Sequence, residues 1–156
     1  MVKLKRLLLV IGIVMILYIP ICRVMNRTKK DDQMIGVIRI PSIQLELSIY
    51  EGVDEKVLQK GIGHIEQTSY PGDGRGSRCL LAGHRGLPNA ELFEKLGEIK
   101  NGDMFYIEIG AHEYSYEVCD IEVIEPSETE KLVPLEEREL VSLITCTPYC
   151  INTHRL

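Results

Sequence analysis

Several features are missing from this 156-residue chain, and each absence narrows what the protein does. The chain has no internal repeat and no low-complexity segment, so its length suits one domain with an appendage. Acidic residues are absent from residues 1–30, which carry seven Lys and Arg. The remainder carries eleven basic against twenty-three acidic side chains, a net charge of about −12 before histidines. Because phosphate neutralisation needs the opposite sign, this balance argues against a nucleic-acid partner.

Phosphate and metal sites also lack essential parts. The run Gly72–Gly76 has no Lys-Ser/Thr ending of the kind that a phosphate-binding loop needs, so we interpret it as a flexible loop. Cys146, Cys150 and His154 are spaced like metal ligands, but no second cysteine pair accompanies them and Pro148 interrupts helical spacing. We therefore expect no metal and no cofactor.

The segment Leu7–Cys22 contains sixteen residues without a charge. As a helix it would span about 24 Å, close to the thickness of a bilayer core once flanking basic residues snorkel. A cleaved signal peptide is the alternative, but no small-x-small site follows the run. We predict an N-terminal transmembrane anchor over residues 1–26, a linker over 27–34 and a folded domain over 35–156.

Period-2 alternation of apolar residues predicts a mostly β domain. Strands are expected at Ile35–Ile40, Ile43–Tyr50, Arg78–Ala82, Phe105–Ile109 and Tyr114–Val118, and again near the C-terminus. Asp54 is expected to cap a short helix, and Asn89 to cap a second, amphipathic one. The alternation of apolar and polar residues shifts by one position between Val118 and Ile121, which suggests a β-bulge near Cys119. Seven or eight strands with few, short helices predict an antiparallel sheet or closed barrel.

The candidate catalytic residues lie where apolar runs end. The run Val141–Ile144 leads to Cys146, and Pro148 prevents a regular strand from continuing. His84 follows another apolar run, and Arg155 lies where extended structure is expected to resume. A cysteine has a pKa of about 8.5, so a nearby cation is needed to favour its thiolate at neutral pH. Thiol, imidazole and guanidinium together suit nucleophilic acyl transfer.

The remaining cysteines and one histidine have less specific interpretations. Cys79 and Cys119 lie in strand-like runs and are expected to be buried hydrophobes. A disulfide between Cys146 and Cys150 is the alternative to a free nucleophile. His64, near a glycine-rich turn, is open between a structural hydrogen-bonding role and the wall of an active site.

Several motifs resemble those of the sortases, the membrane-anchored cysteine transpeptidases of Gram-positive bacteria. Ser142-Leu-Ile-Thr-Cys146 is similar to their Thr-Leu-x-Thr-Cys motif, with serine in the first position. Leu-Ala-Gly-His-Arg-Gly around His84, and the run from Cys146 to Arg155, resemble the pilus-associated class C members. The likeness extends from about Ile35 to the C-terminus.

This resemblance implies a sortase-type closed β-barrel and a reaction. Cys146 would form a thioacyl-enzyme, His84 would protonate the departing amine and deprotonate the incoming one, and Arg155 would bind the carbonyl oxygen. The expected substrates are surface proteins or pilins with a Leu-Pro-x-Thr-Gly-like sorting signal. The expected acceptor is the amine of a cell-wall precursor or a pilin lysine.

The resemblance also implies a location and a substrate cleft. We expect the protein in the cell membrane, with the catalytic domain outside the cell. The residues expected to bind substrate are Thr145, Leu132, Val133, Tyr149 and Ile151.

Two features depart from the family pattern. No Asp-Pro-aromatic lid motif precedes the barrel, which predicts an open cleft. The chain stops at Leu156, one residue beyond Arg155, which predicts an incomplete closing strand and a poorly held Arg155. The alternative hypotheses are a truncated, non-catalytic remnant that binds sorting signals without turnover and an unrelated cysteine peptidase.

Overall fold

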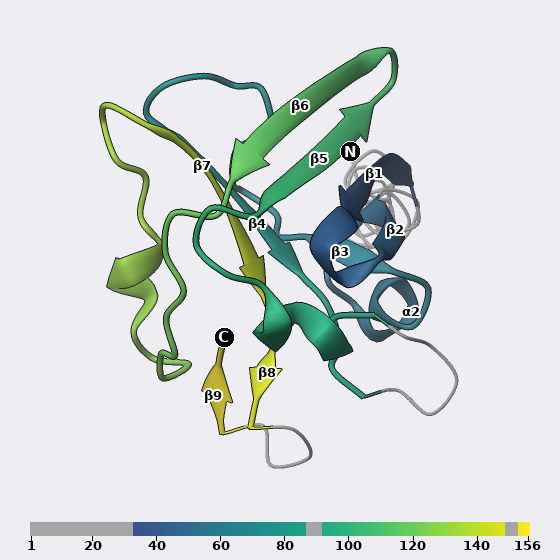
Figure 1. The fold of residues 1–156 in the computed structure, drawn as a ribbon, viewed down its shortest axis with the longest axis vertical. Coiled ribbons are helices and arrows are strands. Elements are labelled where there is room, and N and C mark those ends of the chain that lie inside the picture. Colours follow the sequence, from purple (N-terminus) through teal and green to yellow (C-terminus); the bar gives the residue numbers. More distant parts are fainter. Residues whose placement is uncertain (1–32, 87–91, 149–152) are drawn as a thin grey trace, which may run out of the picture.

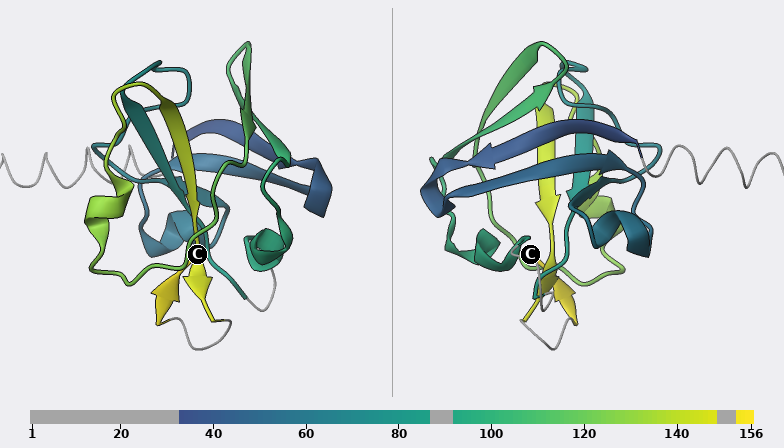
Figure 2. Two further views of the ribbon diagram at one scale, coloured as in Figure 1. Left: turned by 60° about the vertical axis from the view of Figure 1, so that its left-hand side comes forward. Right: turned by 90° about the vertical axis from the view of Figure 1, so that its right-hand side faces the viewer.

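The computed structural model describes residues 33–86, 92–148 and 153–156, and its main element is one curled sheet. The order of its seven strands is β6-β5-β1-β2-β3-β4-β7 (Figure 1). The strands are β1 (Met34–Ile40), β2 (Leu45–Glu51), β3 (Ile62–His64), β4 (Ser77–Ala82), β5 (Met104–Ile109), β6 (His112–Glu117) and β7 (Glu139–Ile144). The sheet wraps around its own core, so that the molecule is a nearly closed barrel (Figure 2).

The remaining elements are short. Strands β8 (Cys146–Thr147) and β9 (His154–Arg155) form a separate antiparallel pair. The helices are α2 (Glu55–Leu58) and the 3-10 turns η1 (Pro41–Ile43), η2 (Glu94–Glu98) and η3 (Thr129–Leu132). The predicted mostly-β fold with few, short helices is therefore confirmed.

Each of the five strands β1 to β5 contributes a fully enclosed side chain to the core. Ile38, Ile49, Ile62, Leu81 and Ile107 are all 0% exposed. Because successive side chains of a strand point to opposite faces, one apolar residue in two is sufficient to cover the inner face. Burial of each such side chain stabilises the fold by roughly 1.5–3 kcal/mol.

Two strand pairs are parallel, and one of them determines where the site forms. β4 and β7 run parallel in continuous register from Ser77↔Glu139 to Ala82↔Ile144. Their carboxyl ends therefore lie together, although about sixty residues separate them along the chain. Residues that follow Ala82 and Ile144 leave the sheet at the same edge.

Asp54 caps α2 as predicted, since its carboxylate accepts a hydrogen bond from the Val57 backbone N–H at 2.9 Å. The amphipathic helix predicted after Asn89 is wrong in its described part, where the chain forms η2 instead. Tertiary packing explains the difference, because Phe93 is completely buried and its N–H donates to the His84 carbonyl. Phe93 is thus held against the end of β4 rather than in a continuous helix.

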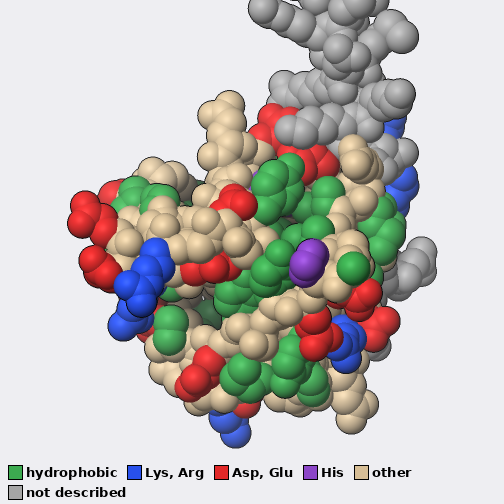
Figure 3. All heavy atoms as spheres, turned by 90° about the horizontal axis from the view of Figure 1, so that it is seen from above, with side chains coloured by type: hydrophobic (Ala, Val, Ile, Leu, Met, Phe, Trp, Pro, Cys, Tyr) green, Lys and Arg blue, Asp and Glu red, His purple; other side chains and the backbone are tan. Residues whose placement is uncertain are grey.

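The membrane anchor predicted over residues 1–26 lies outside the described residues. Within the described ranges, none of the helices has the length and apolar character needed to cross a bilayer. On the face shown in Figure 3, hydrophobic side chains gather between separate groups of acidic and basic side chains.

Candidate active site

His84 and Cys146 leave the sheet side by side. The β4–β7 register pairs Ala82 with Ile144, and the Gly83 N–H donates to the Ile144 carbonyl at 3.0 Å. Two residues beyond these paired positions lie His84, which is outside any strand, and Cys146, which begins β8. The parallel register therefore brings residues 84 and 146 to the same end of the two strands.

Thr145 connects these two strand ends. Its hydroxyl donates to the Gly83 carbonyl at 2.8 Å, and the residue is only 2% exposed. A side chain buried in this way does not face a substrate, so the expectation that Thr145 binds substrate is revised. The threonine instead ties the chain before His84 to the chain before Cys146.

Arg155 lies directly opposite Cys146 in the β8–β9 ladder. Directly opposed residues of an antiparallel pair place their side chains on the same face, about 4.5–5.5 Å apart at Cβ. The backbone of Arg155 is held firmly, because its N–H and carbonyl both bond to Ile124, at 2.8 and 2.9 Å. The expectation that Arg155 is poorly held is therefore wrong: two hydrogen bonds of Leu156 to Thr145 extend the same ladder.

The thiol of Cys146 is free and half-buried, and the imidazole of His84 is 29% exposed. His84 Nε2 has no hydrogen-bond partner among the described residues and lies 3.6 Å from a Glu55 carboxylate oxygen. This distance is too long for a hydrogen bond and allows only an ion pair, which forms when the imidazole is protonated. Because Glu55 is 68% exposed, solvent weakens the pair.

Sequence reasoning missed Arg85, which connects His84 to the cysteine strand. Its guanidinium donates to the Cys146 carbonyl at 3.5 Å and to the Thr147 hydroxyl at 3.1 Å. The guanidinium also packs on η2, where a Cβ on Gly97 would lie 3.2 Å from it. The only sequence signal is the position of Arg85 inside the Leu-Ala-Gly-His-Arg-Gly motif, since nothing local reveals the partner 61 residues away.

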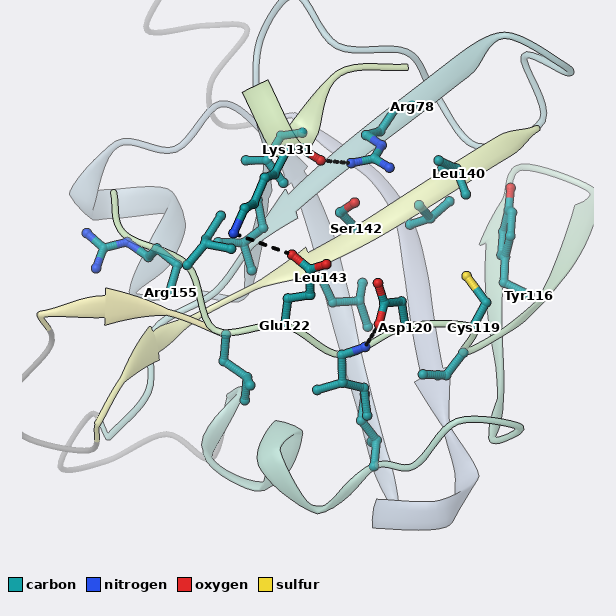
Figure 4. A pocket seen from close by; sticks show the side chains of 18 of the residues that line it. Arg78, Tyr116, Cys119, Asp120, Glu122, Lys131, Leu140, Ser142, Leu143 and Arg155 are labelled. Carbon is teal, nitrogen blue, oxygen red and sulfur yellow. Dashed lines mark hydrogen bonds and ion pairs between the residues drawn. The ribbon is translucent and has the colours of Figure 1, made fainter. Parts of the chain in front are cut away.

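A groove of about 530 Å³ lies beside β7 (Figure 4). Its lining includes Leu132 and Val133, two of the residues predicted to bind substrate. Arg155, the predicted catalytic arginine, lines the same groove. The other two, Tyr149 and Ile151, lie outside the described residues.

His64 belongs to a buried polar cluster rather than to this site. It is 1% exposed, and its Nε2 lies 3.0 Å from the Ser69 carbonyl and 3.1 Å from the Thr68 hydroxyl. Tyr70 stacks on the imidazole and donates to Glu51 at 2.7 Å. Burial and this hydrogen bond raise the pKa of Tyr70 to about 12. These contacts favour the structural interpretation of His64.

The other described cysteines divide between core and surface. Cys79 is 1% exposed, as predicted, and burial raises the pKa of its thiol to about 12. Cys119 is exposed, so the prediction that it is buried is wrong. The reason is that β6 ends at Glu117, and the bulge predicted beyond it does not form because residues 119–123 lie outside any strand.

Fold and site together define a small β-barrel protein that carries a thiol, an imidazole and a guanidinium at one end of its sheet. Comparison with known proteins agrees with this description. The sortase domain model matches residues 38–156, and the chain belongs to the sortase family.

Relatives and solved structures place it among several kinds of sortase. Sortase D of Bacillus subtilis (strain 168) is 32% identical over 117 residues, which cover 75% of this chain and 56% of that protein. Sortase A of Bacillus anthracis is 30% identical over 135 residues, covering 86% of this chain and 62% of the relative. The crystal structure of sortase C1 from Streptococcus suis has a TM-score of 0.79 at 43% identity, covering 85% of this chain and 75% of the other. The chain thus spans less than two thirds of the length of these two curated relatives.

Proposed function

We propose that this protein is a cysteine transpeptidase that cleaves a Leu-Pro-x-Thr-Gly-like sorting signal and transfers the acyl group to an amine. The main observation behind this proposal is which residues lie at the end of the β4–β7 ladder. There His84 and Cys146 each follow by two residues the paired positions Ala82 and Ile144, and Arg155 pairs with Cys146 in the β8–β9 ladder. Membership of the sortase family supports the same reaction class.

In the proposed reaction, Cys146 Sγ attacks the carbonyl carbon of the threonine in the signal. The carbon–nitrogen bond to glycine breaks, and His84 gives its proton to the departing amine. The product is a thioester on Cys146. An acceptor amine then attacks the thioester carbonyl and passes one proton to His84, while the carbon–sulfur bond breaks. The Cys146 sulfur and His84 together then hold the same number of protons as at the start.

Arg155 is proposed to bind the carbonyl oxygen while it carries negative charge. A guanidinium is permanently protonated, and donors that point at a developing oxyanion are typically worth 10²–10³ in rate. The two backbone hydrogen bonds that Arg155 exchanges with Ile124, together with its pairing with Cys146, hold its backbone beside the cysteine. Arg85 and Thr145 are proposed as positioning residues, because each ties the His84 end of β4 to the chain that carries the cysteine.

The substrate cleft is proposed along β7, where Leu132 and Val133 line the groove. Val133 is 51% exposed and is therefore accessible to an apolar group of the substrate. Tyr149 and Ile151 are proposed to complete the apolar wall. The 42–44% identity to sortase C1 structures, among them the sortase C1 of GBS pilus island 1, supports a pilin substrate. A cell-wall substrate is the alternative, because a sortase A structure from Corynebacterium diphtheriae is 40% identical.

The proposed location is the cell membrane, with residues 1–26 as an N-terminal anchor and the catalytic domain outside the cell. The support is the uncharged run Leu7–Cys22 between basic flanks.

The proposal is tested by incubating the full chain with a Leu-Pro-x-Thr-Gly peptide and measuring intact mass. We expect an acyl adduct on Cys146, and hydroxylamine should release it as a hydroxamate. Cys146→Ala should form no adduct, whereas Cys119→Ala, which removes another free thiol, should form it normally. Peptide binding without any adduct would instead support a non-catalytic role, and cleavage by Cys146→Ala would refute the assigned nucleophile.

A further inference from the structure

The short helix α2 packs close to the strand end that precedes His84. β3 pairs with β4 at Gly63↔Ala82, and His84 lies two residues beyond Ala82. α2 packs on this part of β3, because Leu58 Cδ2 lies 3.2 Å from the position that a Cβ on Gly63 would take. Val57 of the same helix is 1% exposed, so it anchors α2 on the barrel. Packing therefore holds α2 near the end of β4.

Glu55 is the residue of α2 that reaches the imidazole. One of its carboxylate oxygens, Oε2, lies 3.6 Å from His84 Nε2. The other, Oε1, accepts a hydrogen bond from Gln59 Nε2 at 3.0 Å, four residues further along the chain. The hydrogen bond with Gln59 thus holds the carboxylate with its second oxygen toward the ring.

The two nitrogens of His84 have different surroundings. Nε2 is enclosed by protein and has no hydrogen-bond partner among the described residues. Nδ1 is not enclosed, and part of the side chain is open to solvent. A substrate amine can therefore reach Nδ1, whereas Nε2 faces Glu55.

We propose that Glu55 is a positioning residue that keeps a proton on His84 Nε2, so that Nδ1 gives and takes the protons of the reaction. This role rests on the proposed function. A neutral imidazole carries its single proton on either nitrogen, and a neighbouring group decides which one. The negative charge of Glu55 attracts an N–H proton at 3.6 Å, without a hydrogen bond, whether the ring is neutral or cationic.

Both half-reactions need the same tautomer of His84. In the first, the imidazolium gives its Nδ1 proton to the departing amine as the carbon–nitrogen bond breaks, and Nε2 keeps its proton. Nδ1 is left with a free electron pair. In the second, that electron pair takes one proton from the acceptor amine, which restores the imidazolium. The opposite tautomer would present a proton to the acceptor amine where an electron pair is needed.

The exposure of Glu55 limits the size of the effect. Its side chain is 68% exposed, and an ion pair at a surface changes an equilibrium by up to about fivefold. Because Nε2 is enclosed, solvent screens only the carboxylate end of the pair. We therefore expect effects of about two- to fivefold, near the upper limit for a surface pair.

The test is the ¹⁵N NMR spectrum of the imidazole nitrogens in the full chain, labelled with ¹⁵N-histidine. The signals of His84 are those that disappear in His84→Gln. We expect the neutral ring to carry its proton on Nε2, and the ratio of the two tautomers to fall about two- to fivefold in Glu55→Gln. Glutamine keeps the size of the side chain and removes its charge. Glu98→Gln, which removes an exposed carboxylate from η2, should leave the ratio unchanged.

Single-turnover acylation by a Leu-Pro-x-Thr-Gly peptide gives a second readout. Glu55→Gln should lower the rate at saturating peptide by about two- to fivefold and leave the half-saturating peptide concentration unchanged, because Glu55 acts through His84. Glu55→Asp keeps the charge but is one methylene shorter, so its rate should fall between those of Glu55→Gln and the native chain.

Three results would overturn the assigned role of Glu55. The first is a proton on Nδ1 in the neutral ring of the native chain. The second is a tautomer ratio that Glu55→Gln leaves unchanged, or that Glu98→Gln changes equally. The third is an unchanged rate of acylation in Glu55→Gln. The native spectrum needs no variant, and Glu55→Asp replaces Glu55→Gln in the comparison if glutamine prevents folding.

The spectrum does not depend on acylation of Cys146, so the two proposals can fail separately. The expected tautomer in a chain that forms no acyl adduct would refute the proposed reaction alone. An adduct on Cys146 together with an unchanged tautomer ratio in Glu55→Gln would refute the role of Glu55 alone.

Discussion

Thr145→Val changes one hydroxyl to a methyl group at almost constant volume, at the junction of the two strand ends that carry His84 and Cys146. In the native protein the hydroxyl donates to the Gly83 carbonyl at 2.8 Å, in a position that is 2% exposed. Valine leaves that carbonyl without this donor and out of reach of solvent. A buried acceptor that loses its partner costs about 1–3 kcal/mol, so the free energy of unfolding should fall by that amount.

The same change should also slow the reaction. Without the Thr145 hydrogen bond, the end of β4 is still joined to the cysteine strand by the Gly83–Ile144 backbone bond and the Arg85 contacts, but no longer through the residue that directly precedes Cys146. A misplacement of about 1 Å between reacting groups can cost up to about 10²-fold in rate. We therefore expect acylation by a Leu-Pro-x-Thr-Gly peptide to slow by about 10–100-fold.

Two measurements with one control check this reasoning. Urea unfolding gives the change in stability, and stopped-time mass spectrometry gives the rate of acyl-enzyme formation. Thr145→Ser keeps the hydroxyl and loses one methyl group, so it should cost about 1 kcal/mol and leave the rate nearly unchanged. If Thr145→Val acylates as fast as the native chain, or if serine slows the rate as much as valine, the hydrogen bond does not position the site.

Three further predictions concern charge. Arg155→Gln should lower the rate of acylation by about 10²–10³ with little change in peptide affinity, as single-turnover kinetics would show, whereas an equal loss of affinity would contradict an oxyanion role. Arg85→Gln should slow acylation less than that and lower stability by about 1–2 kcal/mol, with Arg85→Lys intermediate; a normal rate would exclude the contact with Cys146 from positioning. Burial raises the pKa of Cys79 from 9.0 to about 12, so its contribution to stability is complete below pH 9 and is lost as pH rises toward 12, by about 1.4 kcal/mol per pH unit. Cys79→Ala should therefore lose less stability than the native chain between pH 9 and 10 in urea unfolding, and equal losses would be inconsistent with a buried neutral thiol.

Local patterns predicted much of the fold because local chemistry decides it. The alternation in β1, β2 and β5 identified half-buried strands, and the carboxylate of Asp54 capped a helix within three residues. Cys146 could be placed at a strand end because Pro148 has no N–H to donate. The helix after Asn89 was mispredicted because the contact of Phe93 with the end of β4 lies outside any local window.

The site could be predicted in its residue types but not in its supporting contacts. Cys146, His84 and Arg155 follow from motifs, and their catalytic roles remain predictions. Thr145 belongs to the same motif, yet its side chain turns into the protein, because the parity of the strand puts its hydroxyl under the Gly83 carbonyl. Arg85 had no recognisable partner in the sequence.

The amino-acid sequence by itself determined which segments become strands. It also determined which strand ends are followed by candidate catalytic side chains, and of what type these side chains are. These properties depend on alternation, turn residues and side-chain type over a few neighbouring positions. Only the tertiary structure decided that β4 and β7 run parallel, so that residues 84 and 146 follow neighbouring strand ends, and that a groove lies beside β7. Register between distant strands depends on how the whole barrel closes around its core, and a window of neighbouring residues contains no information on that closure.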